Sequence, residues 1–291
     1  MSGPLLIAGG EADPSLPVLA AAAVRLGVEP LMLCHGDSEP LICWDYQDDR
    51  LSIDGRPIDP AGIFLRYDVF GTADAPGTLD RAAAWYSVIQ GWASAHPQVG
   101  QFNRLLHAHA GVKPAELQQA RSLGLAIPRT IITNSLDAAR EFGDEAIAKP
   151  VAGGAYVRQL GKTLAEFADD VQSTPLPAII QERLSYPEYR VFLICGEPHV
   201  FAIRSAHLDY RPHRDNVMDY LGSAPALTAT IDRLTQLARS LGCDFCACDL
   251  KTREGSAEPV FLEINTGPMF AAFDACAAGA LTEAMVRHLL A

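Results

Sequence analysis

The chain contains 291 residues, of which 49% are hydrophobic and 20% are charged, so it has enough apolar material for at least one full core. Lys and Arg number 23 against 35 Asp and Glu, and the net charge of −12 disfavours nucleic acid and anionic membranes as partners. Apolar runs such as 18–24 fall far short of the roughly 20 residues that span a bilayer, so we expect a cytoplasmic chain without membrane contact.

Residues 1 to about 100 predict a small α/β domain. The expected elements are a strand at 4–8, a helix at 16–24, a strand at 30–34, strand or hairpin segments at 51–57 and 63–65, and a helix at 79–92. Gly9 and Gly10 follow the first strand, but Pro14 stands where a phosphate-binding helix should begin. A dinucleotide-binding Rossmann site is therefore not expected.

The next segment predicts a turn that handles phosphate. The expected elements before it are a helix at 113–124, a strand at 127–133 and a short helix capped by Asn134-Ser135. A strand then carries Lys149 into a turn with Gly153 and Gly154, where amide donors and an ammonium group can converge on one anion. Only four of the 23 basic residues are lysines, which weakly favours a specific role for each of them.

The rest of the chain predicts sheet followed by helix. Thr163 and Glu166 have the spacing of a capping box, which predicts a helix of about two turns. Beyond it, the expected elements are strands at 178–182, 189–195 and 199–205, a helix at 226–241, a hairpin of strands 243–251 and 259–264, and a helix at 281–290. The polar segment 204–214 is either a solvated loop or a substrate-binding loop.

The predicted C-terminal hairpin brings oxygen ligands together. Glu263 and Asn265 share a face of their strand, and Asp249 can lie opposite them. Such a set suits Mg²⁺, which shares its coordination with nucleotide phosphates. The alternative is that Asp249 and Asn265 are strand-end turn residues and that Glu263 faces solvent. We favour the metal because Glu263 interrupts an apolar run, where an unpaired buried carboxylate would be costly.

Three of the seven cysteines form the pattern Cys243-x-x-Cys246-x-Cys248. A metal cluster is one interpretation. We assign these cysteines to the core because no second Cys or His pair at zinc spacing stands nearby. The low cysteine density also indicates reduced thiols rather than a disulfide scaffold.

Six motifs, in chain order, resemble those of the ATP-grasp superfamily. They are Lys113, Ala148-Lys149-Pro150 with its glycine loop, Gln181-Glu182-Arg183-Leu184, Glu188-Tyr189-Arg190-Val191, Cys248-Asp249-Leu250, and the segment 261–268. Within the superfamily they are similar to the ribosomal-protein glutamate-ligase-like (RimK-like) group. The resemblance implies an α/β chain with α+β lobes: a pre-ATP-grasp domain at 1–102, a central lobe at 103–180 and a C-terminal lobe at 181–291.

The resemblance also implies roles for individual residues in binding ATP and Mg²⁺. The implied nucleotide-binding residues are Lys113, Lys149 and Arg190 for the phosphates, Gly153 and Gly154 as a cover, Gln181, Glu182 and Leu184 for adenine, and Glu188 for the ribose. The implied magnesium ligands are Asp249, Glu263 and Asn265, and the implied catalytic residues are Lys149, Arg190 and Arg204.

Three arginines are candidate substrate contacts, namely Arg66, Arg204 and Arg211. Arg66 ends an N-terminal strand and could bind a carboxylate bidentately, although a surface salt bridge explains it almost as well. Arg204 stands where the resemblance implies a contact to an acyl phosphate. Arg211 is the best candidate in the polar segment 204–214.

The implied reaction is the ATP-dependent joining of a carboxylate to an amine through an acyl phosphate. The substrate would be a small molecule or a peptide that carries both groups. Segments 113–120 and 209–211 are also similar to graspetide-type ligases, which act on ribosomal peptides. An ATP-binding regulatory protein without ligase activity and a small-molecule kinase of the same fold are the alternatives, and a homo-oligomer is left open.

Overall fold

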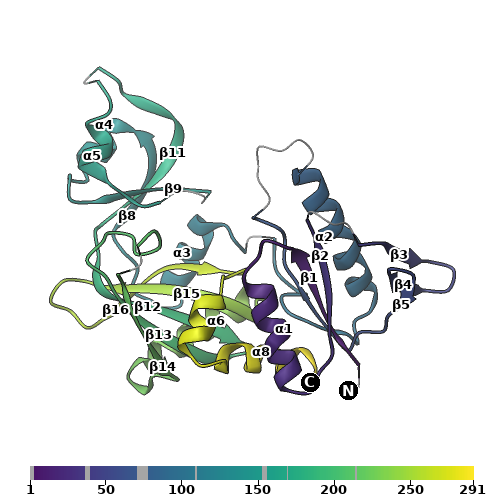
Figure 1. The fold of residues 1–291 in the computed structure, drawn as a ribbon. Coiled ribbons are helices and arrows are strands. Elements are labelled where there is room, and N and C mark those ends of the chain that lie inside the picture. The colour runs from purple at the N-terminus through teal and green to yellow at the C-terminus, as the bar shows by residue number, and fades with distance from the viewer. Residues whose placement is uncertain are drawn as a thin grey trace. The chain divides into compact units, whose positions relative to one another are not determined.

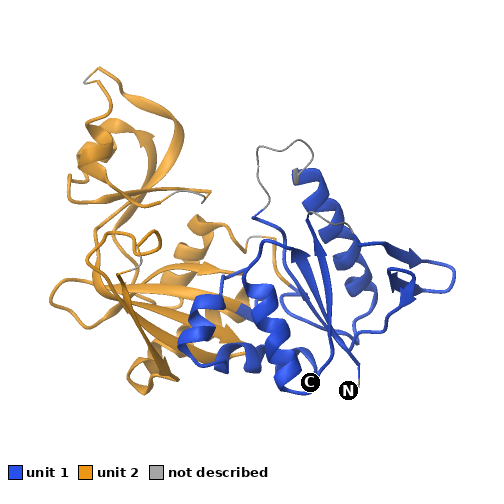
Figure 2. Cartoon of the chain, viewed as in Figure 1, with its two compact units in different colours: residues 1–105, 243–245, 267–291 blue, residues 106–242, 246–266 orange. Residues whose placement is uncertain are grey.

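The computed structural model describes residues 3–36, 40–70, 78–108, 110–152, 156–168, 170–213 and 215–291. They form two compact units (Figure 2): unit 1 comprises residues 1–105, 243–245 and 267–291, and unit 2 comprises residues 106–242 and 246–266. Each unit contains sheet and helix, so the predicted α/β class is confirmed (Figure 1). The expected boundaries of a three-part chain, at residues 102 and 180, stay a prediction.

Unit 1 is built on a parallel sheet with the strand order β2-β1-β6-β7. Its strands are β1 (Leu5–Gly10), β2 (Pro30–His35), β6 (Gly62–Leu65) and β7 (Gly100–Gln101). Helix α1 (Ser15–Arg25) connects β1 to β2, which confirms the predicted β-α-β opening. A small antiparallel sheet follows, made of β3 (Ile42–Asp45), β4 (Arg50–Ile53) and β5 (Arg56–Pro57). Strand β3 was not predicted.

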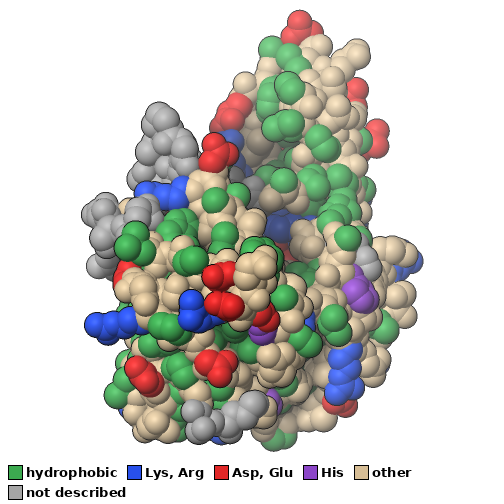
Figure 3. All heavy atoms as spheres, turned by 90° about the vertical axis from the view of Figure 1, so that its right-hand side faces the viewer, with side chains coloured by type: hydrophobic (Ala, Val, Ile, Leu, Met, Phe, Trp, Pro, Cys, Tyr) green, Lys and Arg blue, Asp and Glu red, His purple; other side chains and the backbone are tan. Residues whose placement is uncertain are grey.

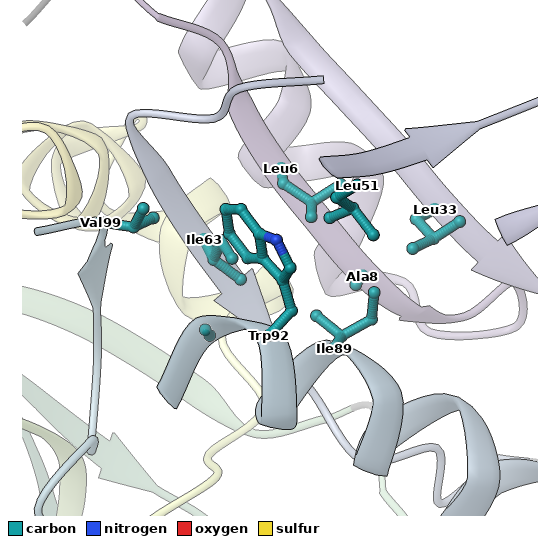
Figure 4. Packing of buried hydrophobic residues seen from close by; sticks show 9 residues of the cluster. Leu6, Ala8, Leu33, Leu51, Ile63, Ile89, Trp92 and Val99 are labelled. Atoms are coloured by element: carbon teal, nitrogen blue, oxygen red, sulfur yellow. The ribbon is translucent and has the colours of Figure 1, made fainter. Parts of the chain in front are cut away.

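The core of unit 1 lies between its parallel sheet and helix α2 (Thr78–Ala95). Figure 4 shows Ile89 and Trp92 of this helix beside side chains from β1, β2, β4 and β6. Leu6 and Ile63 are fully buried there, so the apolar spacing predicted at 79–92 faces the sheet as expected.

The C-terminal helices α7 (Ala271–Cys276) and α8 (Ala280–Leu289) also belong to unit 1. Helix α8 packs against α1 and approaches β6 and β7 closely. A Cβ atom added to Gly62 or Gly100 would lie only 2.4 or 2.0 Å from the carbonyl oxygen of Leu289. Glycine at these two positions is what allows the helix to approach.

Unit 2 contains an antiparallel sheet with the order β10-β9-β11-β8. Its elements are β8 (Thr130–Ser135), α4 (Leu136–Arg140), β9 (Ile147–Pro150), β10 (Arg158–Gln159), α5 (Leu160–Leu164) and β11 (Ser173–Gln181). The predicted cap is confirmed, because Ser135 Oγ accepts a hydrogen bond of 3.3 Å from the Ala138 amide.

The predicted capping box at Thr163 and Glu166 is wrong. Helix α5 begins before Thr163, whose hydroxyl donates a hydrogen bond back to the Gln159 carbonyl. Glu166 instead forms an ion pair with Arg158. The Arg158 guanidinium therefore binds the Glu166 carboxylate, which a capping box would need at the start of the helix.

The second sheet of unit 2 has the order β14-β13-β12-β15-β16. Its strands are β12 (Ser185–Ile194), β13 (Glu197–Arg204), β14 (Val217–Gly222), β15 (Phe245–Thr252) and β16 (Pro259–Asn265). Helix α3 (Lys113–Ser122) packs on β16, and α6 (Thr228–Ser240), which follows the 3₁₀ turn η1 (Pro225–Leu227), packs on α3. The predicted hairpin of β15 and β16 is confirmed, whereas β14 and α7 were not predicted.

The surface mixes charge signs. Figure 3 shows one face on which acidic, basic and hydrophobic side chains are interspersed. Within the described ranges, no helix combines the length and the apolar composition that a bilayer span requires.

Candidate active site

Opposite charges meet where the first turn of α3 packs on β16. Lys113 is the first residue of α3, and its Nζ atom lies 2.9 Å from Oε2 of Glu263. Burial alone would raise the pKa of Glu263, but the ammonium groups of Lys149 and Lys113 lower it instead. Glu263 is therefore ionised at neutral pH.

Lys149 lies on β9, and its ammonium group is close to the same carboxylate. Burial lowers the pKa of Lys149, Lys113 lowers it further, and the charges of Glu263 and Asp249 oppose this. Because burial disfavours its charge, this half-buried ammonium group is stabilised when another anion binds beside it.

Asp249 lies directly opposite Glu263 in the β15–β16 pairing. Asp249 is 8% exposed, and its Oδ1 atom lies 3.3 Å from Nη1 of Arg190 on β12. Burial raises the pKa of Asp249 to about 6, with Arg190 opposing and Glu263 adding to the shift. We call Lys113, Lys149, Arg190, Asp249 and Glu263 the charged cluster.

Two further residues extend the charged cluster from the loop after β13. Arg211 is held by Asp209, with Nε 2.9 Å from Oδ1, and its charge acts on Glu263 and Lys149. Tyr210 hydrogen-bonds to Arg190, and burial raises the pKa of its hydroxyl. The predicted substrate residue Arg211 thus lies with the charged cluster.

Glu188 is buried on β12 and forms an ion pair with Lys251, whose Nζ lies 3.3 Å from Oε2. Burial raises the pKa of Glu188 to about 7, Lys251 opposes the shift, and the charge of Asp249 adds to it. The ribose contact implied for Glu188 stays a prediction, since this carboxylate already has a cationic partner.

The segment that links β11 to β12 carries the residues implied for adenine. Glu182 accepts hydrogen bonds at 3.0 Å from the Arg129 amide and at 2.8 Å from Arg253 Nη2. Gln181 is fully buried, and its Oε1 atom accepts no hydrogen bond from any residue that the structure describes. Leu184 is buried beside them.

A cavity of about 380 Å³ opens next to this segment. It is lined by Ile147, Arg158, Gln159, Lys162, Arg183 and Leu208. Ile147 lies on the same strand as Lys149, and the Leu208 carbonyl accepts a hydrogen bond of 3.3 Å from Lys251, the partner of Glu188.

Two other predicted site residues, Arg204 and Asn265, lie at strand ends. Arg204 ends β13, where it is more than half exposed and pairs with Asp219 of β14. Asn265 is exposed at the end of β16, opposite Ala247. Gly153 and Gly154 lie outside the described residues.

Arg66 belongs to unit 1, and its guanidinium group is engaged there. Its Nε atom lies 3.1 Å from Oδ2 of the buried Asp13, and Nη2 donates to the Pro268 carbonyl. Burial lowers the pKa of Arg66, and Asp13 opposes the shift. A substrate contact by Arg66 stays a prediction.

The three cysteines of the Cys243-x-x-Cys246-x-Cys248 pattern are buried, as expected for core positions. The Cys243 thiol donates to Asn103 Oδ1 at 3.3 Å. Cys246 and Cys248 lie on β15, each with no exposed surface.

Lys251, Tyr210, Lys162 and the apolar cavity residues were missed by the motif analysis. One signal for the lysines was present, because the chain has only four. All four contact either the charged cluster, its neighbour Glu188 or the adjoining cavity. A specific role for each lysine stays a prediction.

The residues present fit Mg²⁺. Asp249 and Glu263 supply carboxylate oxygens of the kind that hard cations prefer. Oδ1 of Asp249 is buried and pairs with the Arg190 guanidinium at 3.3 Å, but it accepts no well-aligned hydrogen bond from the residues that the structure describes. A cation bound there would complete the coordination of this atom beside Arg190.

No protein-family model matches the sequence, and no curated protein matches it. Solved structures do match over nearly the whole chain. The ATP-grasp ligase PsnB, complexed with minimal precursor, Mg and ADP, is 23% identical with a TM-score of 0.76, covering 98% of this chain and 97% of that one. The macrocyclase MdnC from Microcystis aeruginosa, bound with precursor peptide MdnA, is 17% identical with a TM-score of 0.73, covering 98% and 99%.

A more distant match extends the comparison to another kind of ligase. D-alanine–D-alanine ligase from Bacillus anthracis is 14% identical with a TM-score of 0.59, covering 99% of this chain and 96% of that one. Because these likenesses span nearly the full length of each protein, the fold expected from the six motifs is confirmed. The chain has the ATP-grasp fold.

Proposed function

We propose that the chain is an ATP- and Mg²⁺-dependent carboxylate–amine ligase. The observation that carries the proposal is the charged cluster, in which two lysines and an arginine converge on two carboxylates within one compact unit. Such an arrangement is suited to a magnesium triphosphate, whose phosphates need cations and whose metal needs carboxylates.

Each residue of the charged cluster then has a role. Asp249 and Glu263 would hold Mg²⁺, with Asn265 as the third ligand at the strand end. Lys113 and Lys149 would bind the phosphates, and Lys113 would exchange Glu263 for a phosphate oxygen. Bound Mg²⁺ supplies charge stabilisation at the transferred phosphoryl group. Arg190 keeps the buried Asp249 carboxylate oriented.

The chemistry follows from the poor reactivity of a carboxylate at neutral pH. A substrate carboxylate oxygen attacks the γ-phosphorus of ATP, the bond to ADP breaks, and an acyl phosphate forms. The amine then attacks the acyl carbon, loses a proton and displaces phosphate. Positioning and cation contacts carry these steps without a covalent enzyme intermediate.

The substrate class that we infer is a peptide. The PsnB and MdnC structures that resemble this chain contain a precursor or a precursor peptide. Arg211 next to the charged cluster is the best placed candidate to contact a substrate carboxylate or the acyl phosphate. Adenine would occupy the cavity beside Ile147 and Leu208, next to the buried acceptor on Gln181.

Hydroxylamine trapping tests the proposal against its alternatives. Protein, Mg-ATP and hydroxylamine are incubated with a panel of amino acids and of peptides rich in Asp, Glu and Lys, and products are identified by mass spectrometry. A ligase yields a substrate hydroxamate with acceptor-dependent ADP release. A phosphate ester would instead show a kinase, and nucleotide binding without any turnover across the panel would favour a regulatory protein.

A further inference from the structure

A second group of metal-binding side chains lies in unit 2, in the loop 205–216 between β13 and β14. It consists of His207, His213 and Asp215. The two imidazole rings stack with centroids 3.4 Å apart and planes 8° from parallel. Nε2 of His207 lies 3.0 Å from Oδ2 of Asp215. Side chains that are separated by up to eight residues thus meet at one point.

Hydrogen bonds from outside the three side chains hold this arrangement. Tyr186 Oη donates to the His207 carbonyl at 2.8 Å, and Asn216 Nδ2 donates to the His213 carbonyl at 2.7 Å. The His213 amide donates to the Tyr210 carbonyl at 3.0 Å. These bonds restrain the backbone at both histidines, which lowers the ordering entropy that a ligand must overcome.

We propose that His207, His213 and Asp215 bind a Zn²⁺ ion. One ring nitrogen of each histidine and one carboxylate oxygen lie within 4.8 Å of one another. Tetrahedral ligands at about 2.0–2.1 Å from zinc lie about 3.3 Å apart, so small side-chain rotations close the site. Two imidazoles and one carboxylate are a zinc donor set, and water fills the remaining position.

The donor chemistry separates this site from the charged cluster. Mg²⁺ prefers oxygen ligands and keeps its waters, so it would select Asp249 and Glu263 rather than two imidazoles. An ion pair between His207 and Asp215 explains that contact alone. It does not account for a nitrogen of the second imidazole lying within 4.8 Å of the other two donor atoms, which a shared metal ion would use once the two rings turn out of their parallel stack.

The position of the site suggests what the metal does. The same loop carries Tyr210, which bonds to Arg190, and Arg211, whose charge acts on Glu263. It also carries Leu208 of the cavity. Zinc bound at its base would restrict the loop that presents these residues.

Equilibrium dialysis of the full chain against Zn²⁺, in excess Mg²⁺ and with metal analysis, tests the proposal. We expect one Zn²⁺ per chain, with affinity lowered about tenfold or more by His213→Gln and by Asp215→Asn. His107→Gln, at an exposed histidine outside the loop, is the matched control and should bind as the wild type does. Circular dichroism checks that each variant is folded.

Two results would overturn the zinc site. One is the absence of saturable Zn²⁺ binding by the wild type, which would leave only a stacked histidine pair. The other is equal affinity in the wild type and in both loop variants. Titration of the same samples with Mg-nucleotide reports on the charged cluster separately, so that failure of one site is not mistaken for failure of the other.

Discussion

At the scale of single residues, burial decides what each ion pair contributes. Asp249 and Arg190 are 8% exposed, whereas Arg204 and Asp219 form a pair that is about half exposed. Removing one partner of a buried pair leaves the other charge in a poorly solvated place. The two predicted catalytic arginines should therefore differ sharply in their effect on stability.

Replacing each arginine with methionine measures this difference. Arg190→Met should lower the free energy of unfolding by about 3–5 kcal/mol, because Asp249 loses its buried partner. Arg204→Met should change it by about 1 kcal/mol or less. Urea unfolding of both variants gives the two values, and equal losses would show that the Arg190 pair is not buried in solution.

A pH profile of stability tests the environment of Glu188. In the folded chain this carboxyl keeps its proton up to about pH 7, whereas its ordinary pKa is 4.5. The folded state then binds more protons than the unfolded state between these values, so the free energy of unfolding falls as pH rises through this window. The fall attributable to Glu188 is at most about 3.5 kcal/mol, since one pKa unit corresponds to about 1.4 kcal/mol.

Glu188→Gln isolates this contribution. The stability of this variant should fall less steeply between pH 4.5 and about 7, because the glutamine side chain does not titrate. Chemical denaturation across this pH range gives the slope. An unchanged slope would mean that the pKa of Glu188 is ordinary in the folded chain.

Local spacing predicted some site residues and not others. Lys149 precedes a glycine turn and Glu263 interrupts an apolar run, so a few neighbouring residues are enough to single out each of them. Lys251 and Tyr210 have no such signal, because their roles come from partners on other strands, Glu188 and Arg190.

At the scale of elements, competition between nearby hydrogen-bond and ion-pair partners explains why one predicted helix cap is confirmed and the other is wrong. Ser135 caps α4 because its amide partner lies three residues ahead and the backbone before it is extended. Glu166 could not cap because Arg158, brought near by the β9–β10 hairpin, takes its carboxylate. Strand β14 was not predicted because it is only six residues long and its side chains are partly or fully exposed.

The approach of α8 to the parallel sheet gives a prediction for Gly100. In Gly100→Ala the new Cβ would lie 2.0 Å from the Leu289 carbonyl oxygen, so the helix end must shift. We expect a loss of about 1–3 kcal/mol in unfolding free energy.

The control for Gly100→Ala is Gly91→Ala in helix α2. There the nearest atom to the new Cβ is a Trp44 ring carbon at 3.8 Å, and alanine favours helix by about 1 kcal/mol. Thermal unfolding should therefore show one variant destabilised and the other unchanged or stabilised. Equal stability of the two would contradict the close approach.

At the scale of the whole molecule, the division into units is not contiguous in sequence. Residues 243–245 and 267–291 join unit 1 through long-range contacts, such as Asn103 Oδ1 accepting from the Phe245 amide at 2.9 Å. Arg66 likewise donates to the carbonyl of Pro268. Domain boundaries placed between consecutive segments cannot include C-terminal residues that fold back onto the N-terminal unit. The order of motifs along the chain was nevertheless enough to predict the fold.

The central claim is that one magnesium nucleotide is held by Lys149 and by Glu263 together. Calorimetric titration of the full chain with the nonhydrolysable analogue AMPPNP, in the presence of Mg²⁺, tests it most directly. The controls are Arg121→Met and Glu258→Gln, which remove exposed charges elsewhere in unit 2.

The account predicts saturable binding of one nucleotide by the wild type and by both controls, and affinities about ten- to a hundredfold weaker for Lys149→Met and for Glu263→Gln. Wild-type affinity in both of these variants, or no saturable binding by the wild type, would contradict it.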